Sequence, residues 1–233
     1  MKKFLLITCL LACITYADTH SQSKPNIIYI LTDDLGYGDV KVYNKEGKIN
    51  TPNIDKLAKQ GMRFTDAHSP SGVCTPTRYS IMTGRYPWRS QRPVGVLNGF
   101  SRPLMENDRA TVASLLKENG YNTAVVGKWH LGLGWVPKRE YAHLLGNKRY
   151  GIDAEMNPDH IDLTAPMTVS PNTNGFDYSY VLPASLDMQP YGYVENGKLV
   201  DPLTSFTTGK KPDTGYAGAF WRPGLMSPSF DFF

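Results

Sequence analysis

The sequence predicts an α/β fold in which helices and strands alternate along the chain and stack in layers. Three observations support this: a β-branched apolar run at residues 25–32, a capped helical segment at 51–61, and a second one at 111–120 that leads directly into a strand-like run at 121–126. The chain has 233 residues, of which 41% are hydrophobic and 20% charged. This composition is typical of globular proteins, and the length is sufficient for one sizeable core.

The first residues have the pattern of an export signal. Two lysines precede an apolar run at residues 4–14, and small or polar residues follow. This pattern predicts a signal peptide at residues 1–17, cleaved after Ala17, and a mature chain of residues 18–233 exported to the periplasm or the medium. Residues 10–13 also resemble a lipoprotein cleavage box, which leaves open a lipid anchor on Cys13. The apolar run is too short for a transmembrane helix.

The net charge of +4 is mild, and no basic run accompanies it. It therefore gives no indication of nucleic-acid binding, and it permits an anionic substrate without requiring one. Once the leader is removed, Cys74 is the single cysteine of the mature chain. An unpaired thiol in an exported protein indicates a chemical role.

The run at residues 25–32 has the character of a strand buried on both faces. It ends at Asp33 and Asp34, and open α/β sheets bind their ligands at this edge. Two carboxylates without nearby histidine or thiolate favour calcium or magnesium over zinc. A solvated turn rich in aspartate and glycine is the alternative interpretation.

Residues 51–61 carry helix signals, with Thr51 as the expected N-cap and Gly61 as the stop. The alternating run at 62–68 predicts a strand that leads to the Cys74 loop. His68 at its end is expected to be structural or solvated, although it could also line a polar site.

Cys74 begins a short predicted helix, with Arg78 one turn later. A helix start collects unpaired backbone N–H groups and partial positive charge, and a guanidinium suits a tetrahedral oxyanion. The apolar pair Ile81 and Met82 is expected to anchor this helix in the core. The alternative is a buried structural cysteine.

Lys128 and His130 follow the strand predicted at 121–126. Two residues apart in extended backbone, they are expected on the same side, where they could neutralise an anion and move protons. A surface lysine and a structural histidine are the alternative. Further along, Asn196 and Gly197 predict a hairpin turn between residues 193–195 and 198–200.

These motifs carry a family resemblance. Residues 74–78 read Cys-x-Pro-x-Arg, residues 81–84 add an apolar pair and Thr-Gly, and residues 120–130 match a second signature. The chain resembles the type I, formylglycine-dependent sulfatases of the alkaline phosphatase superfamily, and is arylsulfatase-like. The resemblance implies a layered helix–sheet–helix fold with a large mixed central sheet. It also implies that residues 18–233 are the N-terminal part of a longer catalytic domain, incomplete at the C-terminus.

The resemblance implies a role for each site residue. A maturation system would oxidise Cys74 to formylglycine, whose hydrate attacks sulfur while calcium, preferred over magnesium, polarises the sulfate. The implied catalytic residues are Cys74, Arg78, Lys128 and His130; the sulfate-binding residues are Lys128 and Ser185; and the metal ligands are Asp33, Asp34 and the group derived from Cys74.

The implied function is hydrolysis of sulfate esters on a small molecule or a glycan. Two alternatives stay open: hydrolysis of phosphate or phosphonate esters, and a non-catalytic truncated remnant that binds sulfated glycans. The family's second metal-binding pair, and a later histidine and lysine, are expected beyond Phe233. The chain by itself is therefore expected to bind metal weakly and to turn over slowly or not at all.

Overall fold

The computed structural model describes residues 24–146, 155–209 and 222–230. The chain divides into two compact units, Met1–Arg63 and Phe64–Phe233, and each is considered by itself. The predicted leader at residues 1–17, including Cys13, lies outside the described residues. Among the helices within the described ranges, none is both long and apolar enough to cross a bilayer.

The first unit contains a short 3-10 helix, η1 (Tyr37–Asp39), and the predicted helix, α2 (Pro52–Gln60). Thr51 occupies the N-cap position as expected, but its hydroxyl does not cap the helix. It accepts a hydrogen bond from the Lys41 N–H at 3.0 Å and donates to the Asp55 carboxylate at 3.1 Å. Thr51 therefore fastens the preceding loop to the first turn of α2.

The prediction of two strands before Cys74, at residues 25–32 and 62–68, is wrong. Residues 25–32 belong to neither sheet of the described chain, and Ile28 and Ile30 are 85% and 80% exposed. Residues 62–68 are irregular. A β-branched or alternating run forms a strand only where a neighbouring strand pairs with it, and that requirement is not written in the local pattern.

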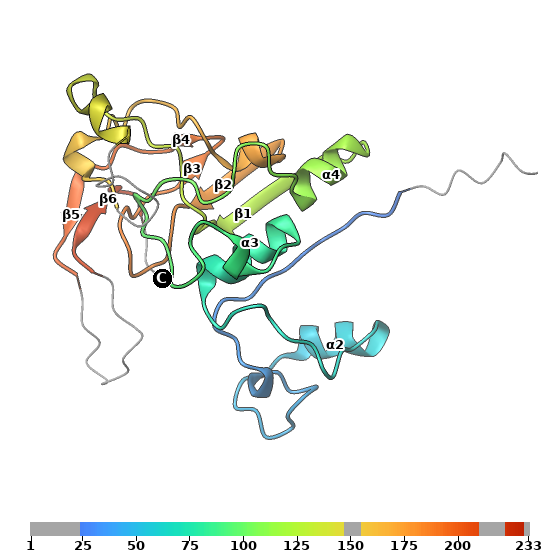
Figure 1. Ribbon diagram of the computed structural model, residues 1–233. Helices are drawn as coiled ribbons and strands as arrows, with labels where there is room; N and C mark the ends of the chain where they lie inside the picture. Colours follow the sequence, from blue (N-terminus) through green and yellow to red (C-terminus); the bar gives the residue numbers. More distant parts are fainter. Residues whose placement is uncertain (1–23, 147–154, 210–221, 231–233) are drawn as a thin grey trace, which may run out of the picture. The chain divides into compact units, whose positions relative to one another are not determined.

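The second unit is built on a mixed four-stranded sheet in the order β1-β2-β3-β4 (Figure 1). The first two strands are parallel, and the other pairs are antiparallel. The strands are β1 (Ala124–Lys128), β2 (Tyr178–Leu182), β3 (Val194–Glu195) and β4 (Lys198–Leu199). Asn196 and Gly197, at φ values of 46° and 79°, form the predicted hairpin turn. The mixed sheet with its helices confirms the α/β class.

Two α-helices of this unit bear out the predictions. The helix α3 (Cys74–Thr83) begins at the cysteine, and α4 (Val112–Glu118) is capped by Thr111, which accepts from the Ser114 N–H at 3.0 Å. Both lie near β1 in Figure 1. The remaining elements are η2 (Pro87–Arg89), η3 (Arg139–Gly146), η5 (Pro158–His160), η6 (Pro171–Asn174), β5 (Ser205–Thr207) and β6 (Gly224–Met226).

The core of the second unit joins α3 to the ends of β1 and β2. Its buried side chains come from α3, from the loop before α4, from the segment after β1 and from β2. They include Tyr79, Met82, Leu97, Phe100, Trp129, Leu131 and Val181. Of the apolar pair predicted to anchor α3, Met82 is buried in this core, whereas Ile81 is only half-buried. Burial of these large side chains holds the start of α3 against the end of β1.

Candidate active site

The candidate site lies at the carboxyl edge of the parallel pair β1 and β2. Lys128 is the last residue of β1, and Ser185 follows the end of β2 by three positions. Backbone pairing continues past the strands, because the Trp129 N–H donates to the Leu182 carbonyl at 2.9 Å. Since parallel strands end at the same edge, the two loops that carry Lys128 and Ser185 leave the sheet together.

Three side chains from three separate segments meet at this edge. Cys74 is the first residue of α3, after an extended Val73, and its side chain is partly buried. The Lys128 ammonium lies 3.1 Å from the Cys74 Sγ and 3.3 Å from the Ser185 Oγ. A cation therefore lies beside a thiol at a helix start, which is an arrangement that favours an anion.

Arg78 holds the backbone of Lys128. One turn after Cys74, its guanidinium donates a hydrogen bond of 2.6 Å to the Lys128 carbonyl. A charged donor on a partly buried carbonyl makes a strong link, so the start of α3 and the end of β1 are held in register.

His130 lies close to the same edge, but extended backbone does not bring it there as predicted. The strand ends at Lys128, and His130 takes a positive φ of 58°. Its ring is buried, with Nε2 at 2.7 Å from the Leu97 carbonyl. Because a carbonyl oxygen only accepts, Nε2 carries the proton in the neutral ring and Nδ1 is its basic nitrogen.

Sequence reasoning missed two neighbours of His130. The Thr75 hydroxyl donates to the His130 carbonyl at 2.9 Å and accepts from the Leu97 N–H at 3.1 Å. These partners are 55 and 22 positions from Thr75 in the chain. Thr75 occupies a variable position of the Cys-x-Pro-x-Arg motif, and no local signal marks Leu97.

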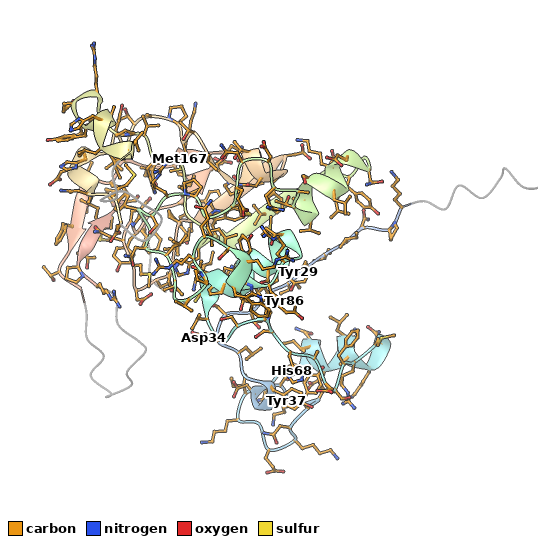
Figure 2. All side chains as sticks on the ribbon, viewed as in Figure 1. Tyr29, Asp34, Tyr37, His68, Tyr86 and Met167 are labelled. Atoms are coloured by element: carbon orange, nitrogen blue, oxygen red, sulfur yellow. The ribbon has the colours of Figure 1, made fainter. Side chains whose placement is uncertain are left out.

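Asp33 and Asp34 belong to the first unit, where Asp34 lies before the η1 turn that holds Tyr37 (Figure 2). Both carboxylates are exposed, and Asp34 has a φ of 57°. Within the described ranges, no group of three or more histidine, cysteine, aspartate or glutamate side chains is arranged to hold a metal ion.

His68 is solvated, in agreement with the preferred interpretation. Its side chain is 84% exposed, and Nε2 lies 2.8 Å from the Asp66 carboxylate.

A separate cavity of about 710 Å³ is lined by residues that include Arg102, Glu106 and Trp135. None of the predicted site residues lines that cavity.

The chain matches known proteins over most of its length. Residues 25–202 match the family model described as Sulfatase. The N-acetylgalactosamine-6-O-sulfatase of Bacteroides thetaiotaomicron is 42% identical over 189 residues, which are 79% of this chain and 32% of that protein. Arylsulfatase A of Bos taurus is 47% identical over 114 residues, 49% of this chain and 22% of that protein.

Two solved structures resemble this one. A 6S-sulfatase from work on glycosaminoglycan metabolism by Bacteroides thetaiotaomicron superposes with a TM-score of 0.62 at 41% identity, over 76% of this chain and 32% of that chain. The crystal structure of Ps i-CgsB in complex with k-i-k-neocarrahexaose superposes with a TM-score of 0.56 at 30% identity, over 76% of this chain and 37% of that chain. The chain thus spans about a third of the length of these proteins. With its family match over residues 25–202 and an alkaline phosphatase-like fold, the chain belongs to the sulfatase family.

Proposed function

We propose that this chain carries the sulfate-binding side of a sulfuric ester hydrolase, with Cys74 as the residue that becomes formylglycine. The observation that carries the proposal is the meeting of Cys74, Lys128 and Ser185 at the start of α3, within 3.1 and 3.3 Å of the lysine ammonium. An ester with a negative sulfate group would be attracted to this cation and to the helix N–H groups.

Lys128 and Ser185 bind the sulfate in this proposal. The ammonium offsets negative charge on the sulfate oxygens, and the serine hydroxyl donates one hydrogen bond to them. The contact between Lys128 and Ser185 supports this assignment, because it holds both donors toward the same position. Donors oriented in advance lose little freedom when the substrate arrives.

Arg78 and His130 complete the catalytic set. Arg78 orients the group at residue 74 from one helical turn away, while its bond to the Lys128 carbonyl keeps the ammonium in register. His130 moves the proton: with Nε2 donating to Leu97, its Nδ1 is the nitrogen that accepts one.

The chemistry of residue 74 depends on its modification. Hydrated formylglycine supplies two hydroxyl groups on one carbon. One attacks sulfur and the alcohol of the ester leaves; the other then loses its proton, so that the C=O bond of the aldehyde re-forms as the C–O bond to sulfate breaks. An unmodified thiol offers no second hydroxyl. The proposal therefore includes a formylglycine-generating maturation system as a partner of Cys74.

A divalent cation is part of the proposal. Asp33 and Asp34 offer hard carboxylate oxygens, which fit calcium, with magnesium less favoured. Calcium takes six to eight oxygen ligands, so a complete site needs others besides these. When bound, the ion would supply positive charge to the sulfate.

The names of two relatives support the substrate class that we propose. One is named N-acetylgalactosamine-6-O-sulfatase, and one solved structure is a complex with k-i-k-neocarrahexaose. We assign a sulfated glycan or a small sulfated molecule to this chain. The apolar run at residues 4–14 supports export, either with cleavage after Ala17 or with a lipid anchor at Cys13.

The test combines peptide mass spectrometry with turnover, on protein made in its native host from the complete reading frame. The tryptic peptide 64–78 should carry formylglycine at position 74. Sulfate should be released from N-acetylgalactosamine 6-sulfate or 4-nitrophenyl sulfate, and Cys74→Ala should abolish release. Faster hydrolysis of 4-nitrophenyl phosphate would favour a phosphate ester hydrolase instead. Unmodified Cys74 without turnover would support the non-catalytic, glycan-binding alternative.

A further inference from the structure

We propose that Thr75 is a positioning residue for His130, holding both its backbone and its ring through one hydroxyl group. The proposal rests on the proposed function, in which His130 moves a proton. Thr75 directly follows the cysteine, and no part of its side chain is exposed. A buried hydroxyl must be hydrogen-bonded to avoid a free-energy cost, and this one has two partners.

The three residues form a closed hydrogen-bonded ring. The Thr75 hydroxyl donates to the His130 carbonyl at 2.9 Å, and the Leu97 N–H donates to the same hydroxyl at 3.1 Å. The Leu97 carbonyl, in turn, accepts from His130 Nε2 at 2.7 Å. Thr75 thus fixes His130 directly through its backbone and indirectly through the residue that holds its ring.

The conformation of His130 explains why such support is needed. A residue other than glycine with a φ of 58° lies in a sparsely populated region, at a cost that the surrounding structure must offset. The bond from Thr75 holds the carbonyl of this strained residue, and the Leu97 carbonyl selects the tautomer protonated at Nε2. The hydroxyl therefore acts on the ring in two ways: it holds the His130 backbone, and it holds Leu97, whose carbonyl sets the direction and the tautomer of the ring.

A methyl group alone could not do this. Valine has the shape of threonine but neither donates nor accepts, so Thr75→Val would leave the His130 carbonyl and the Leu97 N–H without the hydroxyl. Serine keeps the hydroxyl and loses only the methyl group. The pair of variants separates hydrogen bonding from packing.

The experiment measures sulfate release per formylglycine, because Thr75 adjoins the modified residue and conversion must be quantified by mass spectrometry for every variant. On the complete protein, Thr75→Val should lower kcat at least about tenfold with little change in KM, and Thr75→Ser should stay within about threefold of wild type. The matched control is Thr111→Val, another buried threonine that caps α4: it should lower Tm and leave kcat nearly unchanged. If Thr75→Val does not fold, Thr75→Ala provides the same comparison.

A double-mutant cycle separates positioning from a general structural effect. In a His130→Ala background, Thr75→Val should cost less than about twofold, because its effect acts through the histidine. An equal cost in both backgrounds, or a wild-type kcat for Thr75→Val, would overturn the proposal.

One measurement is independent of turnover. In protein labelled with ¹⁵N-histidine, the neutral His130 ring should be a single Nε2–H tautomer in wild type and a mixture in Thr75→Val. An unchanged ring would overturn the positioning role. Wild-type protein that carries formylglycine and releases no sulfate would instead overturn the proposed function, and the ring measurement would still decide the role of Thr75.

Discussion

The Nζ of Lys128 lies 3.1 Å from the Sγ of Cys74, although 54 positions separate the two residues in the chain. One belongs to the end of a parallel strand and the other to the first turn of a helix. The contact therefore joins the two places where an α/β fold offers favourable electrostatics to an anion.

Replacing Lys128 with methionine keeps most of the length of the side chain and removes its charge. We expect kcat/KM for sulfate release to fall about 10²- to 10³-fold, the range typical of losing one stabilising donor at a reacting oxyanion. The exposed Lys198 of β4 offers a charge-matched control, and Lys198→Met should leave the rate nearly unchanged. Equal rates for the two variants would exclude Lys128 from sulfate binding.

Metal removal tests the assignment of Asp33 and Asp34. Dialysis against EDTA should abolish sulfate release, and calcium should restore it at lower concentration than magnesium. Asp33→Asn or Asp34→Asn should raise the calcium concentration needed for half-maximal activity by at least about tenfold. Loss of a residue that only supports a metal ligand already lowers metal affinity by this factor, and loss of a ligand should cost at least as much. The exposed Asp66, which pairs with His68, provides the control variant Asp66→Asn. Full activity in EDTA would rule out the metal.

The Asp177 carboxylate should make stability depend on acid pH. Hydrogen bonds from Lys117 and then from Thr123 lower the pKa of Asp177 from 3.8 to about 2. Lys117 Nζ lies 2.7 Å from one carboxylate oxygen, and the Thr123 N–H donates to the other at 2.9 Å. The carboxylate therefore ties α4 to the residues that precede β1.

The lowered pKa of Asp177 determines how stability changes with pH. The unfolded chain binds the proton first as pH falls, so the stabilisation is complete above pH 3.8 and is lost as pH falls toward 2. Asp177→Asn should lower the urea midpoint at pH 5 and flatten its decline between pH 4 and 2. Glu118→Gln, at an exposed position of α4, should keep the wild-type slope. Parallel curves for wild type and Asp177→Asn would contradict the prediction.

Gly132 lets the segment after His130 lie close to the backbone of Arg102. It has a φ of 74°, and a Cβ there would lie 2.0 Å from the Arg102 carbonyl oxygen. Gly127 also has a positive φ, of 107°, but a Cβ would meet nothing within 4 Å. Gly127→Ala should cost about 1–3 kcal/mol of unfolding free energy from backbone strain alone. Gly132→Ala should cost more unfolding free energy, because the backbone at Arg102 must also move to make room for the Cβ. Chemical denaturation measures the loss for each variant. Equal losses would show that the close approach at Gly132 adds no cost.

Several features could be predicted because their causes are local. The start of α3 at Cys74, the end of α2 before Gly61, the Thr111 cap and the hairpin turn at Asn196 and Gly197 each depend on residues within a few positions. Caps satisfy nearby N–H groups, and turn residues adopt their own favoured φ values. The chemical set of Cys74, Lys128 and Ser185 also proved close in space.

Other features depend on residues far apart in the chain. The apolar run at residues 25–32 reads as a buried strand, yet strand formation requires a partner that its own pattern does not encode. His130 was expected on an extended strand, whereas its positive φ is held by Thr75 and Leu97. The sequence by itself determined which groups we propose for the chemistry and where the helices and turns begin, because these are properties of neighbouring residues. Only the tertiary structure decided which way the groups face, because that depends on hydrogen bonds between segments 22 to 55 positions apart.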